Sequence, residues 1–190
     1  MKSFNLFLIG ISFLFLFSCK REMNREQLRS YIYDDSNGLK KVYQDKDGLL
    51  FETYLIRKEL IESTKIKGNA STNDSLAYFM LSFSRNGREL LVQGNDFSTY
   101  ATLINNLSFN AAAYCQLLVN EKDTLKLNNS SFVNTFGTAS ANNLLLVFKT
   151  KKPVTDYTLL FEDIGFGTGN QKFLFRKKDI QHLNNIVLKN

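Results

Sequence analysis

The chain is poor in the residues that build most catalytic and metal sites. It contains one histidine, one proline and two cysteines among 190 residues. Structural zinc takes about four nitrogen or sulfur ligands, and His182 with Cys115 is too small a set to supply them. Ser-His-Asp and Cys-His catalytic sets would both require His182, whose neighbours indicate an exposed strand or tail. We therefore predict that the protein is not an enzyme and holds no metal.

The N-terminal segment is the most informative part of the sequence. Lys2 precedes an apolar run from Phe4 to Phe17, which is shorter than the roughly 20 residues that a membrane-spanning helix needs. The run ends in Leu16-Phe17-Ser18-Cys19 rather than in the small residues of an ordinary secretory signal. This ending resembles the lipobox of Gram-negative envelope lipoproteins. The resemblance implies a signal peptide over residues 1–18 and acylation of Cys19.

Acylation of Cys19 implies a location. Each buried methylene contributes about 0.8 kcal/mol, so several acyl chains give lasting membrane attachment. Lys20 rather than an aspartate follows Cys19, and in the lipoproteins that this segment resembles, that favours the outer membrane, on either its periplasmic or its surface face. The location excludes nucleic acid as a partner, and we expect no cofactor apart from the covalent lipid. Cys115 is left without a disulfide partner, and its apolar surroundings predict a buried, inert thiol.

Removal of the signal leaves enough chain for one domain, or for one domain and a small N-terminal unit. Asn24, with Gln27 three residues later, is typical of a helix capping box. Glycine, serine, threonine and asparagine are frequent between Lys65 and Asp74, which indicates a linker. The predicted organisation is an acylated tether at 19–24, a helix and hairpin unit at 25–64, a linker at 65–75 and the main domain at 76–190.

Short apolar segments separated by asparagine, glycine and serine loops predict a mainly β chain. Asn86-Gly87 between two such segments is a strong hairpin signal, and Asp96 can cap a helical turn. The spacing favours an antiparallel β-sandwich of immunoglobulin-like architecture. The expected strands cover residues 39–44, 49–56, 76–84, 89–93, 111–119, 124–127, 143–149, 157–162 and 171–176.

Residues 163–169, Asp-Ile-Gly-Phe-Gly-Thr-Gly, form the most conspicuous motif. They resemble the glycine-rich first motif of S-adenosylmethionine-dependent methyltransferases, which leads from a strand into a helix of a Rossmann-like domain. In this chain the following segment, Gln171 to Arg176, alternates like a strand. We therefore predict a glycine-rich turn or bulge between two strands.

Two kinds of side chain are candidates for partner binding. Aromatic residues in loop-like segments can stack on sugars or anchor a partner protein, or they can fold back and cap the core. Basic clusters follow two of the expected strands and form either a cationic patch toward phosphate-bearing lipid or glycan, or solvated loops. The candidates are Phe132, Phe136, Tyr157, Phe166, Lys151, Lys152, Lys177 and Lys178.

The sequence favours a non-enzymatic binding or scaffolding module of the cell envelope, with a protein or a glycan as its partner. One alternative is a hydrolase using carboxylates near Asp163, which needs a cleft with two carboxylates of raised pKa. Another is a carrier of lipid or small ligands, which needs an apolar cavity of about 300 Å³ or more. Asp74-Ser75-Leu76 and Asp123-Thr124-Leu125 also resemble an O-glycosylation site of some Gram-negative envelope proteins. The oligomeric state is not determined by the sequence.

Overall fold

The computed structural model describes residues 21–61, 75–94, 96–150 and 154–189. This part of the chain is mainly β, as the sequence predicted. The strands are β1 (Glu22–Met23), β2 (Lys40–Gln44), β3 (Leu49–Ile56), β4 (Ser75–Arg85), β5 (Arg88–Glu89), β6 (Cys115–Val119), β7 (Asp123–Val133), β8 (Asn142–Thr150), β9 (Tyr157–Phe161), β10 (Gln171–Phe175) and β11 (Val187–Leu188).

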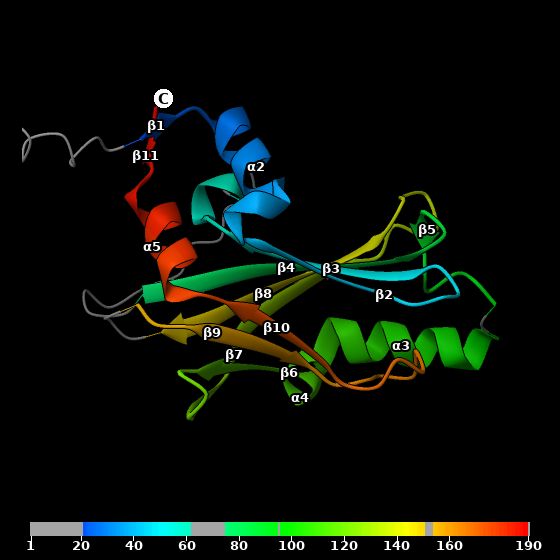
Figure 1. Cartoon of the computed structure of the whole chain (residues 1–190). Helices are drawn as coiled ribbons and strands as arrows, with labels where there is room; N and C mark the ends of the chain where they lie inside the picture. The colour runs from blue at the N-terminus through cyan, green and yellow to red at the C-terminus, as the bar shows by residue number, and fades with distance from the viewer. Residues whose placement is uncertain (1–20, 62–74, 95, 151–153, 190) are drawn as a thin grey trace, which may run out of the picture.

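In the view of Figure 1, α2 lies above the sheet, and α3 and α4 lie below it. α2 and α5 lie together at the end that holds β1, β11 and the C-terminus, whereas α3 extends toward the other end (Figure 1). The helical segments are α2 (Arg25–Tyr33), η2 (Asp35–Asn37), η3 (Lys58–Leu60), α3 (Phe97–Phe109), α4 (Ala111–Tyr114) and α5 (Lys177–Asn185).

One antiparallel sheet forms the body of the protein. Its strands follow the order β10-β9-β6-β7-β8-β4-β3-β2, and β5 pairs with β4. The sheet curls so far that its two edge strands, β2 and β10, come near each other without hydrogen-bonding, which gives a nearly closed barrel. A separate parallel pair, β1 and β11, joins the first described residues to the C-terminal segment.

The expected two-layer, immunoglobulin-like sandwich is not confirmed. The continuous pairing from β10 to β2 makes one curved sheet, and β7, β8 and β4 connect its two halves. The hairpin expected within a separate unit at 25–64 belongs to the same sheet, because β3 pairs with β4 from Leu49↔Arg85 to Ile56↔Tyr78. Of the expected linker at 65–75, only Ser75 lies within the described residues, as the first residue of β4.

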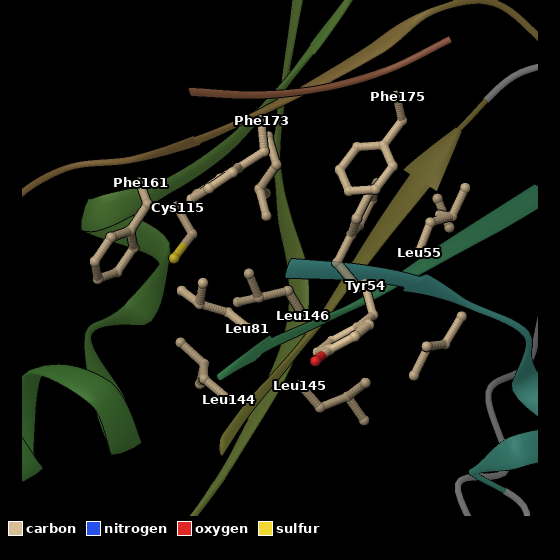
Figure 2. Close-up of a cluster of buried hydrophobic side chains, with 14 of the residues drawn as sticks. Tyr54, Leu55, Leu81, Cys115, Leu144, Leu145, Leu146, Phe161, Phe173 and Phe175 are labelled. Carbon is tan, nitrogen blue, oxygen red and sulfur yellow. The ribbon is translucent and has the colours of Figure 1, made fainter. Parts of the chain in front are cut away.

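Aromatic and aliphatic side chains fill the interior of the curled sheet. Phe79 of β4 lies 5.2 Å from Phe175 of β10, centroid to centroid, and Phe51 of β3 lies 5.7 Å from Phe161 of β9. These rings come from strands far apart in the sheet order, so they contact each other across the interior. Figure 2 shows part of this cluster, where Cys115 lies among buried leucine and phenylalanine side chains.

Several local predictions are confirmed. Asn24 and Gln27 form the reciprocal capping box at the start of α2. Asp96 caps α3 by accepting from the backbone N–H of Thr99 at 2.9 Å. Asn86 and Gly87 both have positive φ, at 52° and 71°, as the two central residues of a tight hairpin turn require.

Other local predictions are wrong because contacts distant in sequence override the local pattern. Residues 111–114 are helical, in keeping with the high helix propensity of alanine, and only 115–119 form a strand. β7 continues through a polar stretch to Val133 because β8 pairs with it across a register shift after Leu127. The segment around His182 is helix α5, and the backbone N–H of Lys177 in its first turn is capped by Asp156, which is distant in sequence.

We expect the substitution Phe79→Ala to cost about 3–5 kcal/mol of unfolding free energy, because it removes a fully buried ring and leaves a cavity. Phe97→Ala is the matched control, since Phe97 is 85% exposed, and its effect should stay within about 0.5 kcal/mol. Urea denaturation followed by circular dichroism measures both. Equal losses in the two variants would contradict the assignment of Phe79 to the core.

Candidate functional site

Part of the predicted site lies outside the described residues. Cys19, Lys151 and Lys152 cannot be placed, and neither can the signal segment 1–18. None of the helices that the structure describes is long and apolar enough to cross a bilayer. The first described residues form β1, so the chain enters the fold at the end of the molecule where α2 and α5 lie (Figure 1).

Three of the four candidate aromatic residues fold back onto the core. Tyr157 is 4% exposed. Phe166 packs against Phe51 and Phe83 with centroid distances of 5.8 and 5.4 Å. Phe132 is partly buried against the same core. These three residues therefore fold back and cover the core, which was the alternative to partner binding.

Phe136 is the exception among the candidate aromatics. Its side chain is 75% exposed, and its backbone has a positive φ of 51°. It lies in the loop between β7 and β8, and its side chain is available to a partner.

The candidate lysines of α5 are exposed in its first turn. Lys177 and Lys178 lie directly after β10. β8 and β10 run in the same direction, because four antiparallel pairings separate them in the sheet order. Thr150, the last residue of β8, and Phe175, the last residue of β10, therefore lie at the same end of the sheet. A cationic patch shared by the lysines that follow the two strands would require this arrangement.

The glycine-rich segment 163–169 is a structural turn between β9 and β10. One oxygen of the Asp163 carboxylate accepts from the backbone N–H of Gly165 at 2.9 Å and of Phe166 at 2.7 Å, and the other accepts from Gly169 at 3.0 Å. Partial burial raises the pKa of Asp163, but these hydrogen bonds outweigh it and hold the pKa below the ordinary value. A general acid would need a raised pKa. The role that the hydrogen bonds support for this carboxylate is to organise the loop.

The remaining reactive groups are isolated. Burial, with the nearby Glu162 carboxylate, raises the pKa of the Cys115 thiol to about 12, as an inert core cysteine requires. His182 is exposed on α5. Among the described residues, no group of three or more histidine, cysteine, aspartate or glutamate side chains could hold a metal ion.

Exposed apolar side chains gather at the end of the molecule opposite to β1. We define this distal patch as Val92, Phe97, Val133 and Phe136, whose exposed fractions are 45%, 85%, 60% and 75%. Phe97 begins α3, whereas Val133 ends β7. Soluble proteins rarely expose large apolar groups together unless they form an interaction site.

Buried polar contacts fix the loops that carry the distal patch. Glu89 is 1% exposed, and its carboxylate accepts from Thr135 Oγ1 and from the backbone N–H groups of Gly137 at 2.6 Å and Ala139 at 2.9 Å. The patch is therefore presented by an ordered loop.

A second polar contact connects this loop to α3. Asn134 Nδ2 donates a hydrogen bond to Tyr100 Oη at 2.9 Å. Tyr100 lies about one helical turn after Phe97 in α3. Gly137 approaches the Val92 side chain so closely that a Cβ at position 137 would lie 3.3 Å from it. The four patch residues are thus held at one end of the molecule by contacts between their loops.

Sequence reasoning found only Phe136 of this patch. Phe97 lies three residues before Tyr100 and seven before Ile104, and this helical spacing predicts a core position. Only the structure shows that Phe97 is exposed, whereas Leu103 and Leu107 are the buried residues of α3.

Comparison with protein-family models, with curated proteins and with solved structures found no match to the chain. Its function is therefore inferred from the chemistry of its surfaces.

We expect Asp163→Asn to lower the unfolding free energy by about 1–3 kcal/mol at pH 7, because an amide cannot accept all the hydrogen bonds of the carboxylate. The folded-state pKa of Asp163 is lowered, so its contribution is fully present above the unfolded pKa of about 3.9. That contribution is lost as the pH falls through the folded value. The contribution is measured as the difference in unfolding free energy between the wild type and the variant, from denaturation at several pH values between 7 and 2. A difference that grows on acidification would contradict the assignment.

Proposed function

We propose that the protein is a lipid-anchored module of the cell envelope that binds a partner protein through the distal patch. The observation that carries the proposal is the strong exposure of Phe97 and Phe136, which belong to the start of α3 and to the β7–β8 loop. Both segments lie toward the end of the molecule away from β1 (Figure 1). The lipobox-like segment at Leu16 to Cys19 supports the membrane anchor.

The anchor and the patch would face opposite directions. Cys19 precedes the first described residue, Arg21, by two positions, so acyl chains on its sulfur would hold the β1 end against the membrane. The distal patch then points away from the lipid. Its aromatic groups would be available to a partner and would not insert into the anchoring bilayer.

The composition of the patch favours a protein over a glycan. Its members are two phenylalanines and two valines, and aromatic side chains are enriched at the centres of protein interfaces. Sugar recognition combines ring stacking with polar groups that hydrogen-bond to hydroxyls. Here the neighbouring polar side chains, Glu89 and Asn134, are already engaged in holding the loop.

The same structure gives little support to the two alternatives. A carrier would hold its ligand inside the barrel, where fully buried rings such as Phe79 and Phe148 pack 5.9 Å apart. A hydrolase centred on Asp163 would need a free carboxylate, but that group is occupied by backbone N–H donors.

The anchor is tested by the substitution Cys19→Ala. We expect the variant to move from the membrane fraction to the soluble fraction and to lack the mass of the acyl chains, because no thiol is left to acylate. Fractionation of the native cell and mass spectrometry of the purified protein measure this. A wild-type protein with an unmodified thiol at position 19 would refute the anchor.

The distal patch is tested by the double substitution Phe97→Ser and Phe136→Ser. We expect the variant to remain folded and lipidated but to lose the proteins that crosslink to the wild type in intact envelopes. Phe109→Ser is the matched control, because Phe109 is 82% exposed at the other end of α3 and should leave crosslinking unchanged.

Each result of the crosslinking experiment has a defined meaning. Loss of crosslinks in the double variant alone supports the proposal. Equal loss in the control, or unchanged crosslinks in the double variant, contradicts it. If the crosslinked species is a second copy of this chain, or a glycan, the proposed partner class is wrong.

A further inference from the structure

The two edges of the main sheet face each other across an open groove. β2 and β10 are the terminal strands of the sheet order, and they diverge from the end held by α5 (Figure 1). The groove between them has a volume of about 570 Å³, which is within the usual range for small-molecule sites. It lies apart from the distal patch and shares no residue with it.

The groove carries a strong excess of positive charge. Lys41 comes from β2, Lys172 from β10, and Arg176 and Lys178 from the start of α5. Asp179 is the one acidic side chain among the residues that line it. Cations from three elements therefore line one concave surface, where they attract anions more strongly than isolated surface lysines do.

Lys41 is the partly buried cation of the groove. It lies opposite Thr53 in the β2–β3 register, on the face that points to the interior, and its ammonium lies 5.7 Å from the centre of the Phe175 ring. Among the described residues, no carboxylate lies within 4 Å of its nitrogen. Burial lowers the pKa of Lys41, Asp179 opposes this shift, and Arg176 adds to it. A bound anion would supply the missing countercharge.

An uncharged donor also faces the groove. Leu55 donates its N–H to the carbonyl of Leu39, and hydrogen-bonded pairs alternate along an antiparallel ladder. The backbone N–H of Val42 therefore points away from β3, toward the groove.

The first turn of α5 cannot provide the anion site by itself. Its Lys177 N–H is already taken by the Asp156 carboxylate at 2.6 Å. The side-chain cations and the free edge of β2 must therefore provide the binding. An arginine fork with several lysines is the donor set typical of phosphate recognition.

We propose that the groove between β2 and β10 binds a small ligand that carries several phosphate groups, with Lys41 and Arg176 as its principal contacts. The phosphates could belong to a lipid headgroup or to a soluble molecule, and the charge arrangement is the same for both. This site is independent of the distal patch and of the partner proposed for it.

The probe is myo-inositol hexakisphosphate, titrated calorimetrically into the protein purified from its native cell, in a non-ionic detergent at low salt. We expect saturable binding that weakens as salt is added. Lys41→Met, which keeps the apolar stem, and Arg176→Gln should each weaken it about tenfold or more, because each removes a charge-assisted contact. Lys122→Gln is the control, since Lys122 lies in the exposed β6–β7 turn outside the groove.

Urea denaturation of each variant separates loss of binding from loss of folding, and the exposed Arg176 provides a test even if Lys41→Met is unstable. Absence of saturable binding, equal weakening in Lys122→Gln, or equally tight binding of citrate would overturn the proposal. Repeating the titration in micelles that contain cardiolipin, a lipid whose headgroup carries two phosphates, distinguishes the sources. If the lipid competes with the probe, the phosphates are assigned to a lipid headgroup. If the lipid does not compete, they are assigned to a soluble ligand.

Discussion

Contacts between aromatic rings across the interior of the curled sheet hold this fold together. Phe79 meets Phe175, and Phe51 meets Phe161, although each pair comes from strands far apart in the sheet order. Burying these rings requires the sheet to bend until its two edges approach. Such pairs contribute about 0.5–1.5 kcal/mol beyond the area that they bury. Since Cys115, the one cysteine of the described residues, is free, this packing must maintain the curvature.

Both candidate surfaces follow from that curvature. The bend brings β2 and β10 close without pairing them, and the start of α5 adds its charges to the groove between them. Toward the other end of the molecule, α3 and the β7–β8 loop carry the exposed phenylalanines Phe97 and Phe136. The buried carboxylate of Glu89 keeps that loop in place. One packing constraint thus produces a cationic groove and an apolar patch on different parts of the surface.

Features determined by neighbouring residues could be predicted from the sequence. The capping box at Asn24 and the turn at Asn86-Gly87 need only contacts within a few positions. The start of α5 could not be predicted, because its cap comes from Asp156. Among the candidate aromatics, Tyr157 and Phe166 lie in loop-like sequence, yet the structure packs them against the core. Phe97 follows a helical core pattern, yet it is exposed.

The sequence by itself determined the mainly β class, the positions of most strands and the scarcity of catalytic groups. It also provides the lipobox-like segment on which the proposed anchor depends. Tertiary structure decided that the strands form one curled sheet, which hydrophobic spacing cannot specify because alternation does not say which strands pair. It also decided which aromatics are exposed and which cations converge. Those properties depend on contacts between residues that are distant in sequence, and such contacts form only when the chain is folded.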